Sequence, residues 1–310
     1  MTPESRNPPP SVCGKVILCG EHFVLFGGPA LALPWRGGEL RLTRAAAAPA
    51  GDPAWAARLR AAWNAARESA GLPAAIDCPW AVDSTIPPGA GLGSSAALSV
   101  ALVRAAFAEA GAGPDDATLI RAATRVEGVF HGRSSGLDPA VVVLGRPVLR
   151  EAGGTLSVVP WRLPVRDLVL ALAPGERRTA QAILRTQAFA SAHPDRFGAL
   201  RDEASDLVRE VAALLADPSG QAGEARLGRL LTRNHAMLAE LGVSTSDLDR
   251  LVAAALGAGA SGAKLCGAGL GGVVLALPPP GGVDAVSAAL AGAGAVRVLP
   301  WRVADAEAPT

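Results

Sequence analysis

The chain has 310 residues, half of them apolar and 18% charged, so it can bury a substantial core and does not have a disordered composition. Its 29 basic and 28 acidic residues are spread along the chain, which argues against binding to nucleic acid or to an anionic membrane. The length predicts two domains that share a cleft, and we place their limits at residues 1–160 and 161–310.

The targeting and redox features of the sequence predict a cytoplasmic protein. The first ten residues are polar and rich in proline, unlike a secretory signal. No apolar run approaches the roughly 20 residues that a transmembrane helix needs. The four cysteines form no CxxC pair and have no histidine at zinc spacing, so we expect free thiols in a reducing compartment.

The first half of the chain alternates predicted strands and helices. Short apolar runs beside glycines predict two strands joined by a tight turn, at residues 16–18 and 23–26. Helices are predicted at 52–71, 95–111 and 114–130, with an extended segment at 80–86.

The second half is predicted to be rich in helices. A strand at 168–173 precedes helices at 177–190, 199–216 and 224–241. The chain then continues with a helix at 246–256, a glycine-rich segment at 257–272, a strand at 273–277, a helix at 283–291 and a strand at 295–303. We predict that the glycine-rich segment is a loop that lies against a ligand, with a flexible connection as the alternative.

The most informative segment is a glycine-rich loop that leads into a helix. Glycines let backbone amides approach phosphate oxygens, the helix N-terminus adds about half a positive charge, and serine hydroxyls can reach a phosphate or a magnesium ion. The loop is not a Walker loop, since no Gly-Lys-Ser/Thr follows, and a helix-capping turn without a ligand is the alternative. The predicted phosphate-binding residues are Pro88, Gly89, Ala90, Gly91, Leu92, Gly93, Ser94 and Ser95.

This loop, PPGAGLGSSAA, closely resembles the phosphate loop of the GHMP kinases, which phosphorylate small alcohols such as galactose, homoserine and mevalonate. Residues 14–22 (GKVILCGEH) and 262–269 (GAKLCGAG) resemble two further motifs of that family, in the same order. The resemblance implies a two-domain α+β GHMP kinase fold, with a first domain like domain 2 of ribosomal protein S5 and a ferredoxin-like second domain. It also implies an enzyme that uses ATP and Mg²⁺.

Within the family, the chain looks most like the mevalonate kinases. Lys15 stands where galactokinases typically have asparagine, and His22 where phosphomevalonate kinases usually have tyrosine. Residues 127–138 (EGVFHGRSSGLD) resemble the ExxxHGxPSGxD segment of mevalonate kinases, and residues 234–244 resemble these enzymes as well. The resemblance therefore implies phosphorylation of mevalonate to 5-phosphomevalonate, for isoprenoid precursors, and a possible homodimer.

The resemblance also implies which residues act in catalysis. Asp138 is expected to be the catalytic base or to orient the hydroxyl, with Lys15 beside it to keep it ionised and to stabilise charge on the attacking oxygen. Ser95 and Glu127 are expected to hold Mg²⁺ through oxygen ligands. The alternatives are a helix cap at Asp138, followed by a proline in the first turn, and a solvated carboxylate at Glu127.

Three further residues are expected to contact the substrate together with Lys15. Glu21 and His22 belong to the first motif, and Thr179 ends the segment GERRT, which resembles a family segment that reads Ser-Thr. His131 lies four residues after Glu127 on the same helix face, and we expect it to make a structural hydrogen bond rather than to act in catalysis.

The sequence departs from the mevalonate kinase pattern at three positions. Ser134 replaces a usual proline, Arg146 replaces the second glycine of a usual pair, and Leu270 interrupts a glycine run. If position 270 requires a positive φ, leucine there costs about 1 kcal/mol or more. Arg146 would suit a phosphorylated acceptor, so phosphomevalonate kinase stays open, as does a kinase for a sugar or an amino alcohol. A catalytically silent regulatory homologue is the alternative outside the enzymes.

Overall fold

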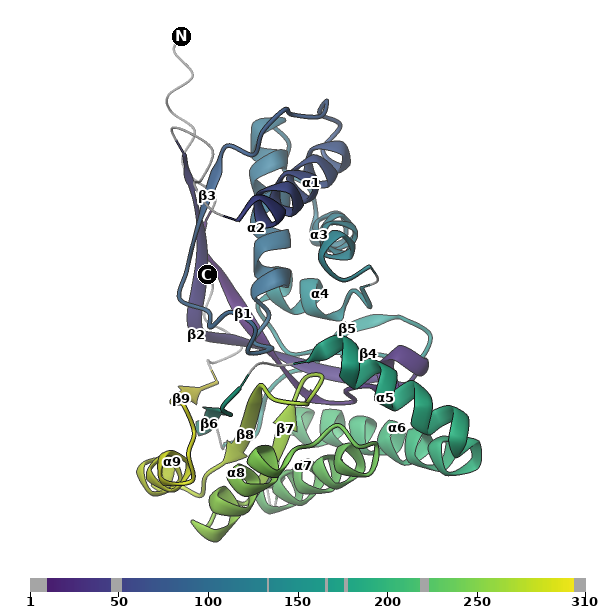
Figure 1. Cartoon of the computed structure of the whole chain (residues 1–310), viewed down its shortest axis with the longest axis vertical. Helices are drawn as coiled ribbons and strands as arrows, with labels where there is room; N and C mark the ends of the chain where they lie inside the picture. The colour runs from purple at the N-terminus through teal and green to yellow at the C-terminus, as the bar shows by residue number, and fades with distance from the viewer. Residues whose placement is uncertain are drawn as a thin grey trace. The chain divides into compact units, whose positions relative to one another are not determined.

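The structure is a computed structural model that describes residues 10–45, 52–132, 134–164, 167–175, 178–217 and 223–303. The chain divides into two compact units (Figure 1). The first unit comprises residues 1–15, 36–87 and 93–145, and the second comprises 16–35, 88–92 and 146–310. Two long strands, β1 (Val12–Cys19) and β2 (Ala30–Arg44), therefore contribute residues to both units.

The first unit is built around the apolar helix α2. Nearly every face of α2 is buried, because α1, α3 and α4 all pack against it (Figure 1). Aspartates cap two of these helices: Asp52 accepts a hydrogen bond from the Ala54 amide, and Asp115 accepts one from the Thr118 amide. The elements are α1 (Pro53–Ser69), β3 (Trp80–Ser84), α2 (Ser94–Glu109), α3 (Asp116–His131) and α4 (Leu137–Leu144), with β3 antiparallel to β2.

The second unit contains an antiparallel four-stranded sheet with the order β7-β8-β6-β9. Its inner strands, β8 (Val273–Leu277) and β6 (Asp167–Leu172), are almost entirely buried, and α7, α8 and α9 pack against the sheet. The remaining elements are β4 (Val148–Arg150), β5 (Leu156–Val158), α5 (Thr179–Ala192), α6 (Pro194–Ala216), α7 (Gly223–Glu240), α8 (Ser246–Gly257), β7 (Gly262–Cys266), α9 (Val283–Gly292) and β9 (Arg297–Arg302).

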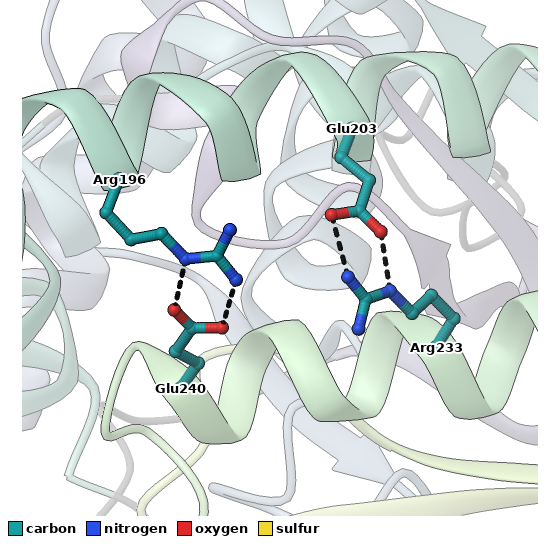
Figure 2. A network of polar contacts seen from close by, with 4 residues as sticks. All are labelled: Arg196, Glu203, Arg233 and Glu240. Atoms are coloured by element: carbon teal, nitrogen blue, oxygen red, sulfur yellow. Dashed lines mark hydrogen bonds and ion pairs between the residues drawn. The ribbon is translucent and has the colours of Figure 1, made fainter.

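Helices α6 and α7 are joined by ion pairs spaced seven residues apart on each helix. Two of the pairs are bidentate, with N–O distances between 2.5 and 2.8 Å (Figure 2). The pairs are Arg196–Glu240, Arg233–Glu203 and Arg226–Glu210. The residue numbers of the partners rise along α6 as they fall along α7, so the pairs favour an antiparallel arrangement of the two helices in this register. These side chains are partly exposed, so each pair contributes little to stability and the pairs act mainly on the register of the two helices.

Most of the predicted helices and strands are present, and two predictions are wrong. Residues 23–26 form a 3₁₀ helix, η1 (Phe23–Phe26), and not a strand. His22 and Gly27 flank it with φ values of 63° and 83°, which turn the chain at both ends of the segment and do not allow an extended backbone there. The glycine-rich segment at 257–272 contains the buried strand β7. The predicted helix start at residue 177 lies outside the described residues. Among the described helices, none is both long and apolar enough to cross a membrane.

Candidate active site

Lys15 and Asp138 form an ion pair in the first unit. The Lys15 Nζ lies 2.7 Å from the Asp138 Oδ2, and the two side chains are 6% and 26% exposed. The cap of α4 is Gly136, so Asp138 is not the cap but lies in the first helical turn, where the helix dipole favours its negative charge. The proximity expected from the sequence is therefore present, and the carboxylate keeps access to solvent.

Gly93, in the glycine-rich loop, closely approaches Lys15. It precedes α2 as its N-cap with φ 84°. A Cβ atom on Gly93 would lie only 2.7 Å from the Lys15 Cγ and 2.9 Å from the Lys15 amide nitrogen. Glycine is thus required both by the backbone conformation and by the contact. The lysine is consequently packed against the start of α2, where free helical amides can bind an anion.

Glu127 is a buried carboxylate on α3 and not a solvated one, with only 5% of the residue exposed. Burial, followed by the negative charge of Asp138, raises the pKa of Glu127 to about 7, against the opposite effects of the Ser134 hydroxyl and Lys15. The Ser134 hydroxyl donates a hydrogen bond to the Glu127 Oε2. Glu127 therefore belongs to the same charged group as Lys15 and Asp138.

His131 connects Glu127's helix to the predicted phosphate loop. Its Nε2 lies 2.9 Å from the Ser95 Oγ. Glu127 and His131 are four residues apart on α3 and share a face, and the His131 side chain contacts the first turn of α2. The expected hydrogen-bonding role of His131 thus takes place at the site itself. Its spacing from Glu127 was the only sequence signal for this, and the neighbouring Arg133 lies outside the described residues.

The chemistry of Ser95 and Glu127 fits a magnesium ion. Mg²⁺ is a hard cation that is usually held by one or two carboxylates together with substrate phosphates and water. Ser95 offers a hydroxyl oxygen at the helix start and Glu127 a buried carboxylate that lacks a cationic partner in direct contact among the ion pairs of the described residues. Among the described residues, no three His, Cys, Asp or Glu side chains come together as a metal-binding group.

Glu21 lies in the second unit, where it has an internal partner. Its carboxylate accepts a hydrogen bond from the Lys264 ammonium, and both side chains are essentially unexposed. The lysine of the third motif is therefore a buried residue of β7. The role of Glu21 toward a substrate stays a prediction.

His22 also has internal partners in the second unit. The Nε2 lies 2.8 Å from the Ala268 carbonyl oxygen and the Nδ1 lies 2.8 Å from the Thr186 Oγ1. Burial lowers the pKa of His22, which favours the neutral ring. In that form the Nε2–H donates to Ala268, and the Nδ1 accepts from the Thr186 hydroxyl. His22 thus ties α5 to the third motif, while Thr179 begins the same helix.

A cavity of about 560 Å³ lies in the second unit beside the glycine-rich loop. Near it, Leu270 has φ 51° and donates its amide hydrogen to the Val243 carbonyl over 2.8 Å, so the strained position expected at Leu270 is present. The cavity is lined by Pro88, Gly89, Ala90, Leu172, Ala173, Gly175, Gly272 and Val296. Three predicted phosphate-binding residues, Pro88, Gly89 and Ala90, therefore line this cavity together with Gly272, which follows the third motif in the chain.

Family models match both halves of the chain. The model described as the GHMP kinases N terminal domain matches residues 57–146, and the one described as GHMP kinases C terminal matches residues 222–296. The chain belongs to the GHMP kinase family. This GHMP kinase is 31% identical to the mevalonate kinase of Thermococcus sibiricus over 301 residues, which cover 87% of this chain and 88% of the relative.

Solved structures share the fold of this GHMP kinase. L. major mevalonate kinase in complex with R-mevalonate aligns with a TM-score of 0.76 and 24% identity, over 98% of both chains. Methanococcus jannaschii mevalonate kinase aligns with a TM-score of 0.77 and 18% identity, over 98% of this chain and all of the other. The predicted two-domain α+β GHMP kinase fold is confirmed.

Proposed function

We propose that this GHMP kinase transfers the terminal phosphoryl group of ATP to the terminal hydroxyl of mevalonate, giving ADP and 5-phosphomevalonate. The Lys15–Asp138 pair, packed against Gly93 at the start of α2, carries the proposal. The identity to a mevalonate kinase along most of the chain supports mevalonate as the acceptor.

In the proposed reaction, the hydroxyl oxygen forms a bond to the terminal phosphorus as the bond to the ADP oxygen breaks. Asp138 orients the hydroxyl and receives its proton, and the Lys15 ammonium stabilises charge on the attacking oxygen. Because a loose transition state needs little proton removal until late, the orientation by Asp138 contributes more than its basicity. Backbone amides of residues 88–95 bind the phosphate groups.

Ser95 and Glu127 would hold Mg²⁺, which supplies charge neutralisation on the phosphates when it is bound. His131 contacts the Ser95 hydroxyl over 2.9 Å and would orient it beside the ion. Glu21, His22 and Thr179 remain proposed substrate-side residues. Glu21 and His22 have internal partners in the second unit, and no substrate contact is needed to explain their burial.

Location, assembly and domain limits are also proposals. The four free cysteines support a reducing compartment, and we propose the cytoplasm. A homodimer rests on resemblance to the family alone. The domain limits 1–160 and 161–310 are proposed on the order of the motifs, with the phosphate loop in the first domain.

A panel of acceptors tests the substrate. ADP release should be fast with mevalonate and slow with phosphomevalonate, galactose and homoserine. Preference for phosphomevalonate would favour the alternative that Arg146 suggests, and no ADP release with any alcohol would favour a silent homologue.

Replacing Asp138 with asparagine tests the catalytic assignment. Turnover should fall about 10³-fold, because asparagine neither orients the hydroxyl through a charged acceptor nor receives its proton, while nucleotide affinity changes little. Asp202→Asn is a matched control, because this substitution makes the same chemical change at an exposed position on α6. If Asp138→Asn retained the turnover of the control, Asp138 would have no part in the chemistry.

A further inference from the structure

Ser134 makes contacts that the proline usual at this position of mevalonate kinases could not make. Its hydroxyl donates a hydrogen bond to the Glu127 Oε2 and accepts one from the Gly136 amide over 3.2 Å. A hydroxyl has one proton and two lone pairs. In this geometry the Ser134 proton is donated to the Glu127 carboxylate, and a lone pair accepts the backbone amide hydrogen of Gly136. Ser134 therefore joins the end of α3 to the start of α4.

This connection links the two carboxylates of the site. Glu127 is the proposed magnesium ligand on α3, and Gly136 is the N-cap of α4, two residues before Asp138. A glutamate side chain has several rotatable bonds, and fixing it in one orientation costs conformational entropy. The hydrogen bond from the Ser134 hydroxyl favours one orientation of the Glu127 carboxylate relative to the turn that carries Asp138.

Metal-binding side chains depend on such contacts. Hydrogen bonds to a ligating carboxylate orient it, and their removal typically weakens metal affinity by about 10-fold to 100-fold. A carboxylate has roughly four lone-pair positions, so one hydrogen bond from Ser134 leaves room for a cation on Glu127. The contact consequently orients the ligand without blocking it.

We propose that Ser134 is a positioning residue of this kinase, which holds the Glu127 carboxylate in place and thereby strengthens the binding of nucleotide-bound Mg²⁺. The proposal rests on the kinase function proposed above, but not on the identity of the alcohol. It assigns a role to a residue at which the sequence departs from the ExxxHGxPSGxD segment that it resembles.

Binding of Mn²⁺, as a paramagnetic substitute for Mg²⁺, to the protein with ADP tests the proposal by electron paramagnetic resonance. Ser134→Ala should weaken Mn²⁺ binding by about 10-fold. Threonine and valine are nearly equal in shape, so Ser134→Thr should bind Mn²⁺ more tightly than Ser134→Val, even if both variants lose some stability. Ser135→Ala is the matched control, because it removes the neighbouring hydroxyl, which accepts a hydrogen bond from the Leu137 amide over 3.4 Å, and leaves the Ser134–Glu127 contact in place.

Two outcomes would overturn the proposal. One is a folded Ser134→Ala protein that binds Mn²⁺ as tightly as the parent, and the other is equal Mn²⁺ affinity in the threonine and valine variants. The assay contains no acceptor alcohol, so its result is independent of whether mevalonate is the substrate. In turnover assays, Ser134→Ala should raise the Mg²⁺ concentration needed for half-maximal rate and leave the KM of the alcohol unchanged.

Discussion

Replacing Gly93 with alanine tests whether the glycine-rich loop positions Lys15. The residue has φ 84°, and an added Cβ would meet the Lys15 Cγ at 2.7 Å and the Lys15 amide nitrogen at 2.9 Å. A rotation of the lysine side chain could relieve the first contact. The second involves the backbone of β1, so relief requires that the strand or the loop move.

The expected cost has two parts. A positive φ costs a residue with a Cβ atom about 1 to 2 kcal/mol, and overpacking in a close contact costs about 1 to 3 kcal/mol. Gly93→Ala should therefore lower the free energy of unfolding by about 2 to 5 kcal/mol. Gly111 is a matched control just beyond α2, because it has φ 68° and an added Cβ there would meet no atom within 4 Å. Gly111→Ala should show only the first part.

Urea unfolding of both variants measures the difference in stability, and ADP release measures turnover. A shift of Lys15 by about 1 Å should lower turnover about 100-fold in Gly93→Ala, and Gly111→Ala should keep the parent rate. Equal stability of the two variants, together with parent-like turnover of Gly93→Ala, would refute the positioning of Lys15 by this contact.

Two further predictions concern the second unit. Since burial lowers the pKa of His22, the unfolded state binds more protons than the folded state below pH 6.5, and stability should fall as the pH drops from 6.5 toward the folded pKa. The melting temperature should therefore depend more steeply on pH, between pH 5 and pH 7.5, in the parent than in His22→Asn, a variant that keeps a residue tolerant of positive φ. An equal dependence of the melting temperature on pH in the two proteins would contradict this. For Leu270, both Leu270→Gly and Leu270→Ala remove a buried side chain, but only glycine relieves the positive φ, so Leu270→Gly should be the more stable by about 1 kcal/mol. If urea unfolding shows alanine to be the more stable of the two, the backbone at 270 is not strained.

The resemblance of short motifs was sufficient to predict that Lys15 and Asp138 lie close together, and their ion pair is present at 2.7 Å. The roles of these residues and of the glycine-rich loop in catalysis and phosphate binding stay predictions. The contact of His131 with Ser95 depends on how α3 packs against α2, and the contact of Ser134 with Glu127 depends on the turn before α4. Spacing along the chain does not contain either piece of information.

The strand β7 shows how glycine can be misinterpreted. Its sequence lies in a glycine-rich segment whose composition predicts a loop. In the structure, a Cβ atom on Gly262 would lie 2.0 Å from the Gly228 carbonyl oxygen of α7. Glycine is needed there because a helix and a strand approach backbone to backbone. The composition that usually indicates a loop here indicates close packing, and only the fold distinguishes the two.

The first motif serves two purposes that its sequence presents as one. Lys15 belongs to the first unit and pairs with Asp138, whereas Glu21 and His22 belong to the second unit and contact residues of the third motif. The Glu21–Lys264 pair is fully buried, and removing one partner of such a pair typically costs about 3 to 5 kcal/mol. Loss of activity in a Glu21 variant would therefore not by itself assign a substrate contact, because loss of the fold predicts the same result. In contrast, the Asp138 side chain is partly exposed, so a folded Asp138 variant reports on the chemistry.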